Sequence, residues 1–220
     1  MSESIAVLGA SRGLGAAFVK AASREISDSK WLLASRKENR LKEVAGTLAD
    51  RAHIFPCDFA APESRGRLLD EMKTFAPTRV FYFAAGGPYG PFHKSALKDH
   101  RWAWEVSFGF AAEVLHWSLN SGSVRQAVFI GSAVAEDQAD PGAASYSAAK
   151  HALRGLIRSV RAEKPALDLR LYSPVYMDTE LLPAHAWPRQ QGLAMDTSRI
   201  AQDLLSWIFI NDDSGFRIYK

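Results

Sequence analysis

Short β-type runs alternate with longer segments of helical spacing along almost the whole chain, and this order limits the fold more than any other sequence feature. Such alternation predicts an α/β protein in which helical crossovers join parallel strands, with ligands at the carboxyl ends of the strands. Six helices are expected at residues 14–26, 38–49, 63–75, 99–119, 145–163 and 198–209. Seven strands are expected at residues 5–9, 31–35, 53–57, 80–85, 127–131, 167–172 and 216–219.

The composition fits one folded domain over residues 1–220, with 47% hydrophobic and 23% charged residues. A net charge of +3 favours neither a nucleic-acid partner nor a membrane surface. The single cysteine, Cys57, excludes an intrachain disulfide, and no Cys/His cluster has zinc spacing, so we expect a reducing, cytoplasmic compartment and no metal site. No segment resembles an export signal or approaches the ~20 apolar residues that span a bilayer.

A glycine-rich loop, Gly9-Ala10-Ser11-Arg12-Gly13-Leu14-Gly15, follows the first expected strand and precedes a helical run. A helix N-terminus offers free N–H groups to an anion, and glycine lets a pyrophosphate approach without a Cβ in its way. The spacing G-x-x-x-G-x-G also fits a plain tight turn, but the position at the first strand-to-helix junction favours phosphate binding. The candidate phosphate-binding residues are Gly9, Ser11, Arg12, Gly13, Leu14 and Gly15.

Tyr146 and Lys150 are four residues apart on an expected helix, so their side chains project from one face. A free tyrosine has a pKa near ~10 and needs a nearby cation to act as an acid or base at neutral pH. The same spacing arises often by chance in residues that only pack and face solvent. Its position downstream of the glycine loop and of a strand ending at Gly131-Ser132 favours a catalytic pair.

The glycine loop and the Tyr146–Lys150 pair resemble the short-chain dehydrogenase/reductase family over nearly the whole chain. The resemblance implies a Rossmann-type doubly wound domain whose seven parallel strands have the order 3-2-1-4-5-6-7, with helices on both faces. It also implies that Tyr146 donates a proton in carbonyl reduction, that Lys150 binds the nicotinamide ribose and lowers the tyrosine pKa, and that Ser132 polarises the substrate carbonyl. Ser132, Tyr146 and Lys150 are thus the candidate catalytic residues.

The charge after the second strand bears on the choice of cofactor. An acidic residue there bonds a free ribose 2′-hydroxyl, whereas arginine accommodates a 2′-phosphate. This chain has Ser35-Arg36-Lys37 there, and Arg12 within the glycine loop. Arg36, Lys37 and Arg40 also fit a solvated helix start, but two separate arginines favour NADP(H), as basic residues at these positions do in the resembling family.

The resemblance places the rest of the cofactor along the ends of later strands. Asp58 matches the family residue that contacts the adenine ring, although a lone Asp also forms turns. Pro174 and Thr179 match a P-G-x-x-x-T segment beside the nicotinamide, with Val175 in place of glycine, unless this is a plain proline turn. The further cofactor candidates are therefore Ser35, Arg36, Asp58, Phe59, Ala84, Ala85, Gly86, Tyr146, Lys150, Pro174, Val175 and Thr179.

Two positions depart from the family pattern. Ala84 stands where the family usually has an asparagine whose amide braces the central sheet. Ser107 stands where a second asparagine often completes a proton relay through water to the lysine, and serine is expected to hold a water less rigidly. The chain also lacks the glycine-rich tail of many tetrameric members, so the expected assembly is a homodimer through the helices beginning near Asp99 and Ser145.

The substrate side is expected near residues 88–93 and under a lid at residues 181–197, whose stretch 181–193 carries His185, Trp187 and two prolines. Tyr89, Phe92 and Trp187 either form an apolar pocket or only pack. The expected substrate is a small molecule, apolar or aromatic, and no residue of the sequence identifies it further.

Two functions compete. The first is an NADP-dependent carbonyl reductase or alcohol dehydrogenase, and the second is a catalytically weak or inactive NADP(H)-binding regulator or scaffold. Ala84 and Ser107 favour the second. Retention of Ser132, Tyr146 and Lys150 favours the enzyme, because a sensor has no chemical need for all three.

Overall fold

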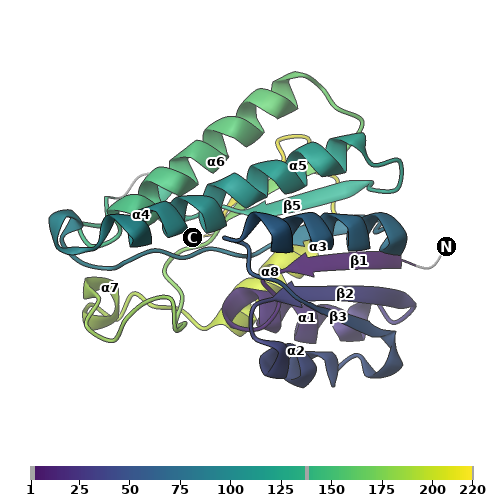
Figure 1. The fold of residues 1–220 in the computed structure, drawn as a ribbon, viewed down its shortest axis with the longest axis horizontal. Helices are drawn as coiled ribbons and strands as arrows, with labels where there is room; N and C mark the ends of the chain where they lie inside the picture. Colours follow the sequence, from purple (N-terminus) through teal and green to yellow (C-terminus); the bar gives the residue numbers. More distant parts are fainter. Residues whose placement is uncertain (1–2, 137–138, 220) are drawn as a thin grey trace.

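A parallel sheet organises the computed structural model, which describes residues 3–136 and 139–219 (Figure 1). Its strand order is β3-β2-β1-β4-β5-β6-β7, and every neighbouring pair is parallel, which confirms the predicted architecture. The strands are β1 (Glu3–Leu8), β2 (Ser29–Ser35), β3 (Ala52–Pro56), β4 (Arg79–Tyr82), β5 (Gln126–Ile130), β6 (Asp168–Ser173) and β7 (Phe216–Ile218).

Helices cover both faces of this sheet (Figure 1). One face carries α3 (Pro62–Phe75), α4 (Leu97–Trp104), α5 (Phe110–Asn120) and α6 (Ala144–Ala162). The other face carries α1 (Gly13–Glu25), α2 (Glu38–Ala45) and α8 (Thr197–Trp207), and the short α7 (Trp187–Gln190) lies outside these layers.

Each face of the sheet has its own hydrophobic core. Successive side chains of a strand point to opposite faces, so Ala6 and Leu8 of β1 join one core while Ile5 and Val7 join the other. Burial on both sides explains why the central strands read as continuous apolar runs in the sequence.

The single helix predicted over residues 99–119 is helical without a break from residue 97 to residue 120, but it contains a π-helical turn. Between α4 and α5 the chain forms a π-helical turn at Glu105–Gly109. There the Tyr82 hydroxyl of β4 donates a hydrogen bond to the Val106 carbonyl at 2.7 Å. Apolar residues recur with helical spacing both before and after this turn, so the spacing alone did not predict the turn.

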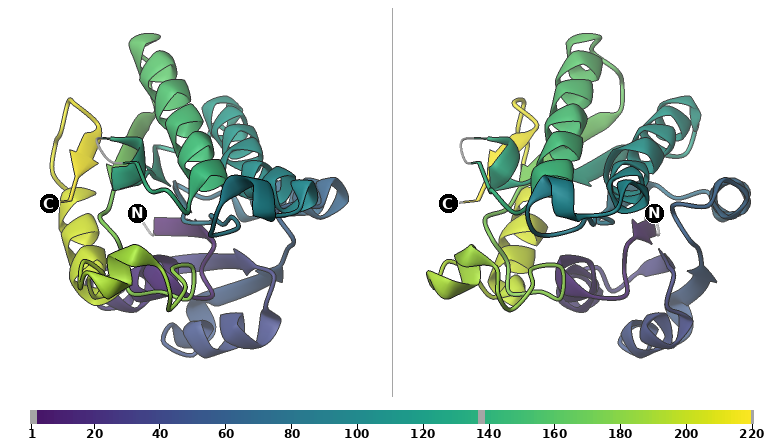
Figure 2. Two further views of the ribbon diagram at one scale, coloured as in Figure 1. Left: turned by 90° about the vertical axis from the view of Figure 1, so that its left-hand side faces the viewer. Right: turned by 60° about the vertical axis from the view of Figure 1, so that its left-hand side comes forward.

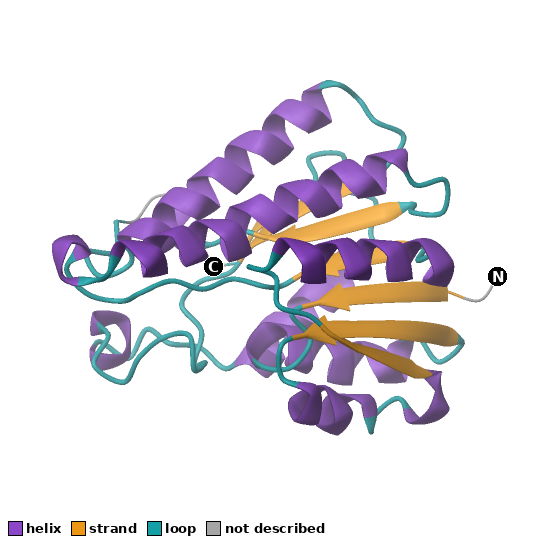
Figure 3. Cartoon of the chain, viewed as in Figure 1, coloured by secondary structure: helices purple, strands orange, loops and turns teal. Residues whose placement is uncertain are grey.

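The carboxyl ends of the strands form one edge of the molecule, and long loops gather beyond it (Figure 3). Figure 2 turns this edge toward the viewer and shows the yellow-green segment around α7 on the side that carries α1 and α8. The sheet order reverses between β1 and β4, which is where parallel α/β sheets bind ligands. None of the helices described is long and apolar enough to cross a membrane.

Candidate active site

The glycine loop has the backbone that its sequence predicted. Gly9 has φ +97° and Gly13 has φ +54°, both in the region that favours glycine. A Cβ on Gly15 would lie 2.3 Å from the Gly9 carbonyl oxygen, and one on Gly9 would lie 2.6 Å from the Ala84 backbone nitrogen. Glycine therefore allows β1, the start of α1 and the chain after β4 to approach closely at the helix N-terminus.

A cavity of about 230 Å³ opens at this point along the carboxyl edge. Its lining brings together most of the residues predicted to bind the cofactor, namely Gly9, Ser11, Arg12, Gly13, Leu14, Gly15, Ser35, Arg36, Asp58, Phe59, Ala84, Ala85, Tyr146, Lys150 and Thr179. A second cavity of about 70 Å³ adjoins it, because Tyr146 and Thr179 line both. Ser132, Pro174 and Val175 line only the second cavity.

Lys150 is a buried basic residue that lines the larger cavity. Its side chain is 1% exposed, and its Nζ donates a hydrogen bond to the Ile130 carbonyl at 2.6 Å. Loss of solvent lowers the pKa of Lys150 to about 7. The Nζ lies 5.6 Å from the centroid of the Tyr146 ring, so the predicted pair does converge.

The Tyr146 hydroxyl is protonated at neutral pH. Burial raises the pKa of Tyr146 above its usual value, while hydrogen bonding with Ser132 acts in the opposite direction. Ser132 lies two residues after the end of β5 in an extended conformation, and the long α6 presents Tyr146 one turn before Lys150. The three candidate catalytic side chains therefore come from two elements held by the sheet.

Arg36, Asp58 and Trp102 line one part of the larger cavity. The Arg36 guanidinium stacks over the Trp102 ring at 5.3 Å. Asp58 Oδ1 accepts the Ala60 N–H at 3.0 Å, so Asp58 forms a turn and also lines the cavity. Trp102 was missed by the sequence analysis, since an aromatic residue on a predicted helix gave no sign that it faced a ligand site.

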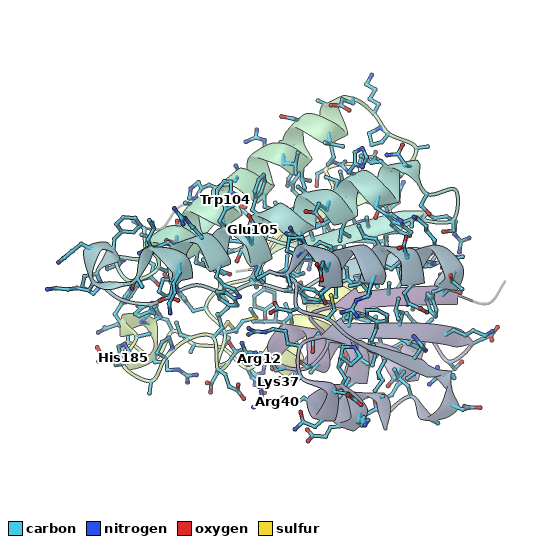
Figure 4. All side chains as sticks on the ribbon, viewed as in Figure 1. Arg12, Lys37, Arg40, Trp104, Glu105 and His185 are labelled. Atoms are coloured by element: carbon cyan, nitrogen blue, oxygen red, sulfur yellow. The ribbon has the colours of Figure 1, made fainter. Side chains whose placement is uncertain are left out.

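Arg12 and Arg40 share one acidic partner. Arg12 Nη1 donates to Glu180 Oε2 at 2.9 Å, and Arg40 Nη1 donates to both Glu180 oxygens at 2.9 Å. The Arg40 and Arg12 guanidinium groups hold the pKa of the Glu180 carboxyl below its usual value. Arg12 and Arg40 lie side by side in Figure 4, with Lys37 between their labels. The sequence analysis did not identify Glu180, which is 140 residues from Arg40.

Ser107, at the position of the family's relay asparagine, bonds the chain after β4, and a weaker hold on a relay water stays a prediction. Ser107 is fully buried, and its Oγ accepts the Gly86 N–H and donates to the Gly86 carbonyl, both at 3.0 Å. Gly86 lines neither cavity, because it packs against the Trp102 ring. Ser107 thus fixes the chain after β4, close to Ala84, where the family's asparagine amide is missing.

The second cavity has apolar walls and one charged residue, Asp140. Asp140 Oδ1 accepts the Tyr89 hydroxyl at 3.1 Å and the Gly142 N–H at 2.9 Å. Of Tyr89, Phe92 and Trp187, for which the sequence left pocket lining and plain packing open, only Tyr89 lines the cavity. Phe92 is 59% exposed and stacks on His100 instead.

The segment predicted as a lid is tied at both ends. Met177 pairs with Met195, the Asp178 N–H donates to the Met195 carbonyl at 2.8 Å, and the Met195 N–H donates to the Tyr176 carbonyl at 2.9 Å. Leu181 and Leu182 line the second cavity. Its action as a lid stays a prediction.

Among residues 3–136 and 139–219, no three His, Cys, Asp or Glu side chains gather into a group that could hold a metal ion.

A scan against models of protein families identifies the family to which this chain is similar. The family model described as short chain dehydrogenase matches residues 3–186, which include the glycine loop, Ser132, Tyr146 and Lys150. A search of the curated proteins finds no match.

Several solved structures share the fold at low identity. An alcohol dehydrogenase from Thermococcus sibiricus, complexed with 5-hydroxy-NADP, has a TM-score of 0.85 at 20% identity and covers 100% of this chain and 95% of its own. A Sphingobium yanoikuyae short-chain dehydrogenase with NADPH has 0.79 at 19% identity, covering 98% and 86%. A Burkholderia phymatum short-chain dehydrogenase/reductase with NAD has 0.82 at 17% identity, covering 99% and 88%.

Proposed function

This chain belongs to the short-chain dehydrogenase family, and on that premise we propose that it interconverts a carbonyl and an alcohol on a small molecule with NADP(H) as cofactor. One observation carries the proposal. Ser132, Tyr146 and Lys150 meet where a cavity lined by the glycine loop adjoins a cavity lined by residues of the predicted lid.

In the reductive direction, Tyr146 gives its hydroxyl proton to the carbonyl oxygen, and Ser132 donates a hydrogen bond to the same oxygen as charge develops there. The raised pKa of Tyr146 keeps that proton in place until the substrate arrives. The Lys150 ammonium, oriented by the Ile130 carbonyl, stabilises the tyrosinate that remains. The nicotinamide ring supplies the hydride when the cofactor is bound.

The residues of the larger cavity suit NADP(H). The approach of Gly15 to Gly9 leaves no room for a Cβ where a pyrophosphate meets the N-terminus of α1. Arg12, Arg36, Lys37 and Arg40 line the same cavity, and guanidinium groups match phosphate in a bidentate way. The similar structures hold NADP, NADPH or NAD, so the preference for NADP(H) comes from this chain's own arginines.

The substrate is proposed to be small, with an apolar or aromatic body. Val134, Pro174, Leu181 and Leu182 supply apolar walls of the second cavity. Residues 181–197 are proposed to act as the lid within a single domain spanning residues 1–220. Because the chain has one cysteine and therefore no intrachain disulfide, we place the protein in the cytoplasm.

We also propose a homodimer formed through the face that α4 and α6 share. Exposed apolar side chains gather near α4, with Leu97 61% and Trp104 42% exposed. Apolar surface of this kind marks contact sites between proteins.

The test is a panel of aldehydes, ketones and quinones in which NADPH absorbance is followed for the native protein and for Tyr146→Phe. Turnover is expected to fall about 10²- to 10⁴-fold in the variant, since it lacks the acid, while the dissociation constant for NADPH stays unchanged. Tyr219→Phe is the matched control, because Tyr219 lines neither cavity. Full turnover by Tyr146→Phe would refute the proposed role.

The scaffold hypothesis keeps one supporting observation. Both hydrogen bonds of the Ser107 hydroxyl go to Gly86, which favours a bracing role over the relay role of the family's asparagine. Tight NADPH binding without turnover across the whole panel would favour this second function.

A further inference from the structure

Glu180 joins three parts of the molecule that are distant in the sequence. Its carboxylate contacts Arg12, which precedes α1, and Arg40 of α2, while Glu180 itself directly precedes the predicted lid. All three residues line the larger cavity. The contact thus ties the start of the lid to the end of the cavity where the proposed cofactor's ribose phosphate belongs.

A carboxylate and a phosphate compete for the same guanidinium groups. The carboxylate is a planar oxyanion and the phosphate is a tetrahedral one, and each accepts paired N–H donors from arginine. Arg40 Nη1 alone contacts both oxygens of Glu180, and Arg12 bonds one of the same oxygens. A phosphate monoester carries about −1.5 to −2 charge at pH 7, against −1 for the carboxylate, so the phosphate is the stronger partner of two arginines.

The other basic residues nearby are differently engaged. The Arg36 guanidinium stacks over Trp102, and among the residues described Lys37 makes no ion pair within 4 Å. The two arginines that Glu180 bridges are therefore the ones already aligned as a pair for an oxyanion.

We propose that Glu180 occupies the 2′-phosphate subsite of the free protein and that a 2′-phosphorylated cofactor binds by displacing it. This inference rests on the proposed use of NADP(H). A cofactor with a free 2′-hydroxyl brings no competing anion, so Glu180 keeps its arginines when NAD(H) binds. Glu180 is then a specificity-determining residue that lowers the affinity for NADP(H) below what Arg12 and Arg40 would otherwise give.

Displacement of Glu180 also changes the start of the lid. Thr179, its neighbour, lines both cavities, and Leu181 follows it into the second cavity. A phosphate that takes the two arginines breaks the contact between this segment and the glycine loop. By thermodynamic linkage, if phosphate binding favours release of this segment, then release of the segment favours phosphate binding by the same free energy.

The binding test uses 2′,5′-ADP and 5′-ADP as probes, titrated calorimetrically into the native protein, Glu180→Gln and the control Asp178→Asn. Asp178 lies two residues away and pairs with Arg189. The affinity for 2′,5′-ADP is expected to rise about five- to tenfold in Glu180→Gln, with 5′-ADP unchanged and the control equal to the native protein. An equal or lower affinity of Glu180→Gln for 2′,5′-ADP would overturn the inference.

A second readout is the rate of trypsin cleavage after Arg189 in the lid. With saturating 2′,5′-ADP the native protein is expected to be cleaved several-fold faster than with 5′-ADP, and Glu180→Gln to be cleaved equally fast with either. Equal native rates would overturn the link to the lid. If the native protein bound both nucleotides equally well, the proposed NADP(H) preference would be refuted. If the predicted affinity shifts were found but the protein turned over no substrate, only the proposed catalysis would be refuted.

Discussion

At the scale of single residues, the burial of Lys150 has a cost to stability. Its ammonium group is almost completely buried, with the Ile130 carbonyl as its hydrogen-bond acceptor. Among the residues described it makes no ion pair within 4 Å. Burial lowers the pKa of Lys150 from 10.5 to about 7, so the unfolded chain binds this proton more readily than the folded one.

Lys150→Met is therefore expected to be more stable than the native protein at pH 7, by about 2–4 kcal/mol after the lost hydrogen bond is counted. The penalty of the native lysine is fully present below about pH 7 and decreases as the pH rises toward 10.5. The gain from the variant must decrease over the same range. Urea unfolding at pH 6, 7, 8 and 9.5 measures it, and a variant that is less stable at pH 7 would contradict this account.

At the scale of elements, the π-helical turn at Glu105–Gly109 is the feature that connects fold and site. The sequence predicted a helix here because its apolar spacing is helical throughout. At this turn the helix makes contacts with distant parts of the chain, namely the Tyr82 hydroxyl on the Val106 carbonyl and the Ser107 hydroxyl on Gly86. Hydrogen bonds between distant segments leave no periodic signal, so this part of the site required the structure.

Ser107→Ala is expected to lower the free energy of unfolding by about 1–3 kcal/mol, because it removes the side chain that bonds both polar groups of Gly86. Ser118→Ala is the matched control. Ser118 is equally buried, but its hydroxyl only adds a bond to the Val114 carbonyl within α5. Chemical unfolding of both variants measures the difference, and equal losses would show that Ser107 does not brace this segment.

At the scale of the whole molecule, the resemblance to the short-chain family predicted the sheet order, and the strand pattern with the residue spacing predicted that Tyr146 and Lys150 converge beside the glycine loop. Strand alternation and helix periodicity are local signals, and the carboxyl ends of parallel strands must share one edge. Pairings such as Glu180 with Arg40 and Asp140 with Tyr89 follow from the folded path of loops. The sequence could not predict them, and it left open whether Phe92 lines a pocket or lies outside one, as the structure shows.

The proposed assembly is a prediction at this scale. The native protein is expected to be a dimer by size-exclusion chromatography with light scattering, and Trp104→Glu to be a monomer, because a two-fold interface brings the new charges together. Ile210→Glu, at a residue 50% exposed and remote in sequence from α4, is the control that should remain dimeric. A monomeric native protein, or a dimeric Trp104→Glu, would rule out this interface.

The most direct test of the central claim is the fate of deuterium placed at both C4 positions of NADPH during carbonyl reduction. The native protein should place one deuterium on the carbinol carbon of the product, and Tyr146→Phe should form about 10²- to 10⁴-fold less labelled alcohol at equal cofactor occupancy. Mass spectrometry of the alcohol gives both results. Equal yields from the two proteins, or an alcohol without deuterium, would contradict hydride transfer assisted by Tyr146.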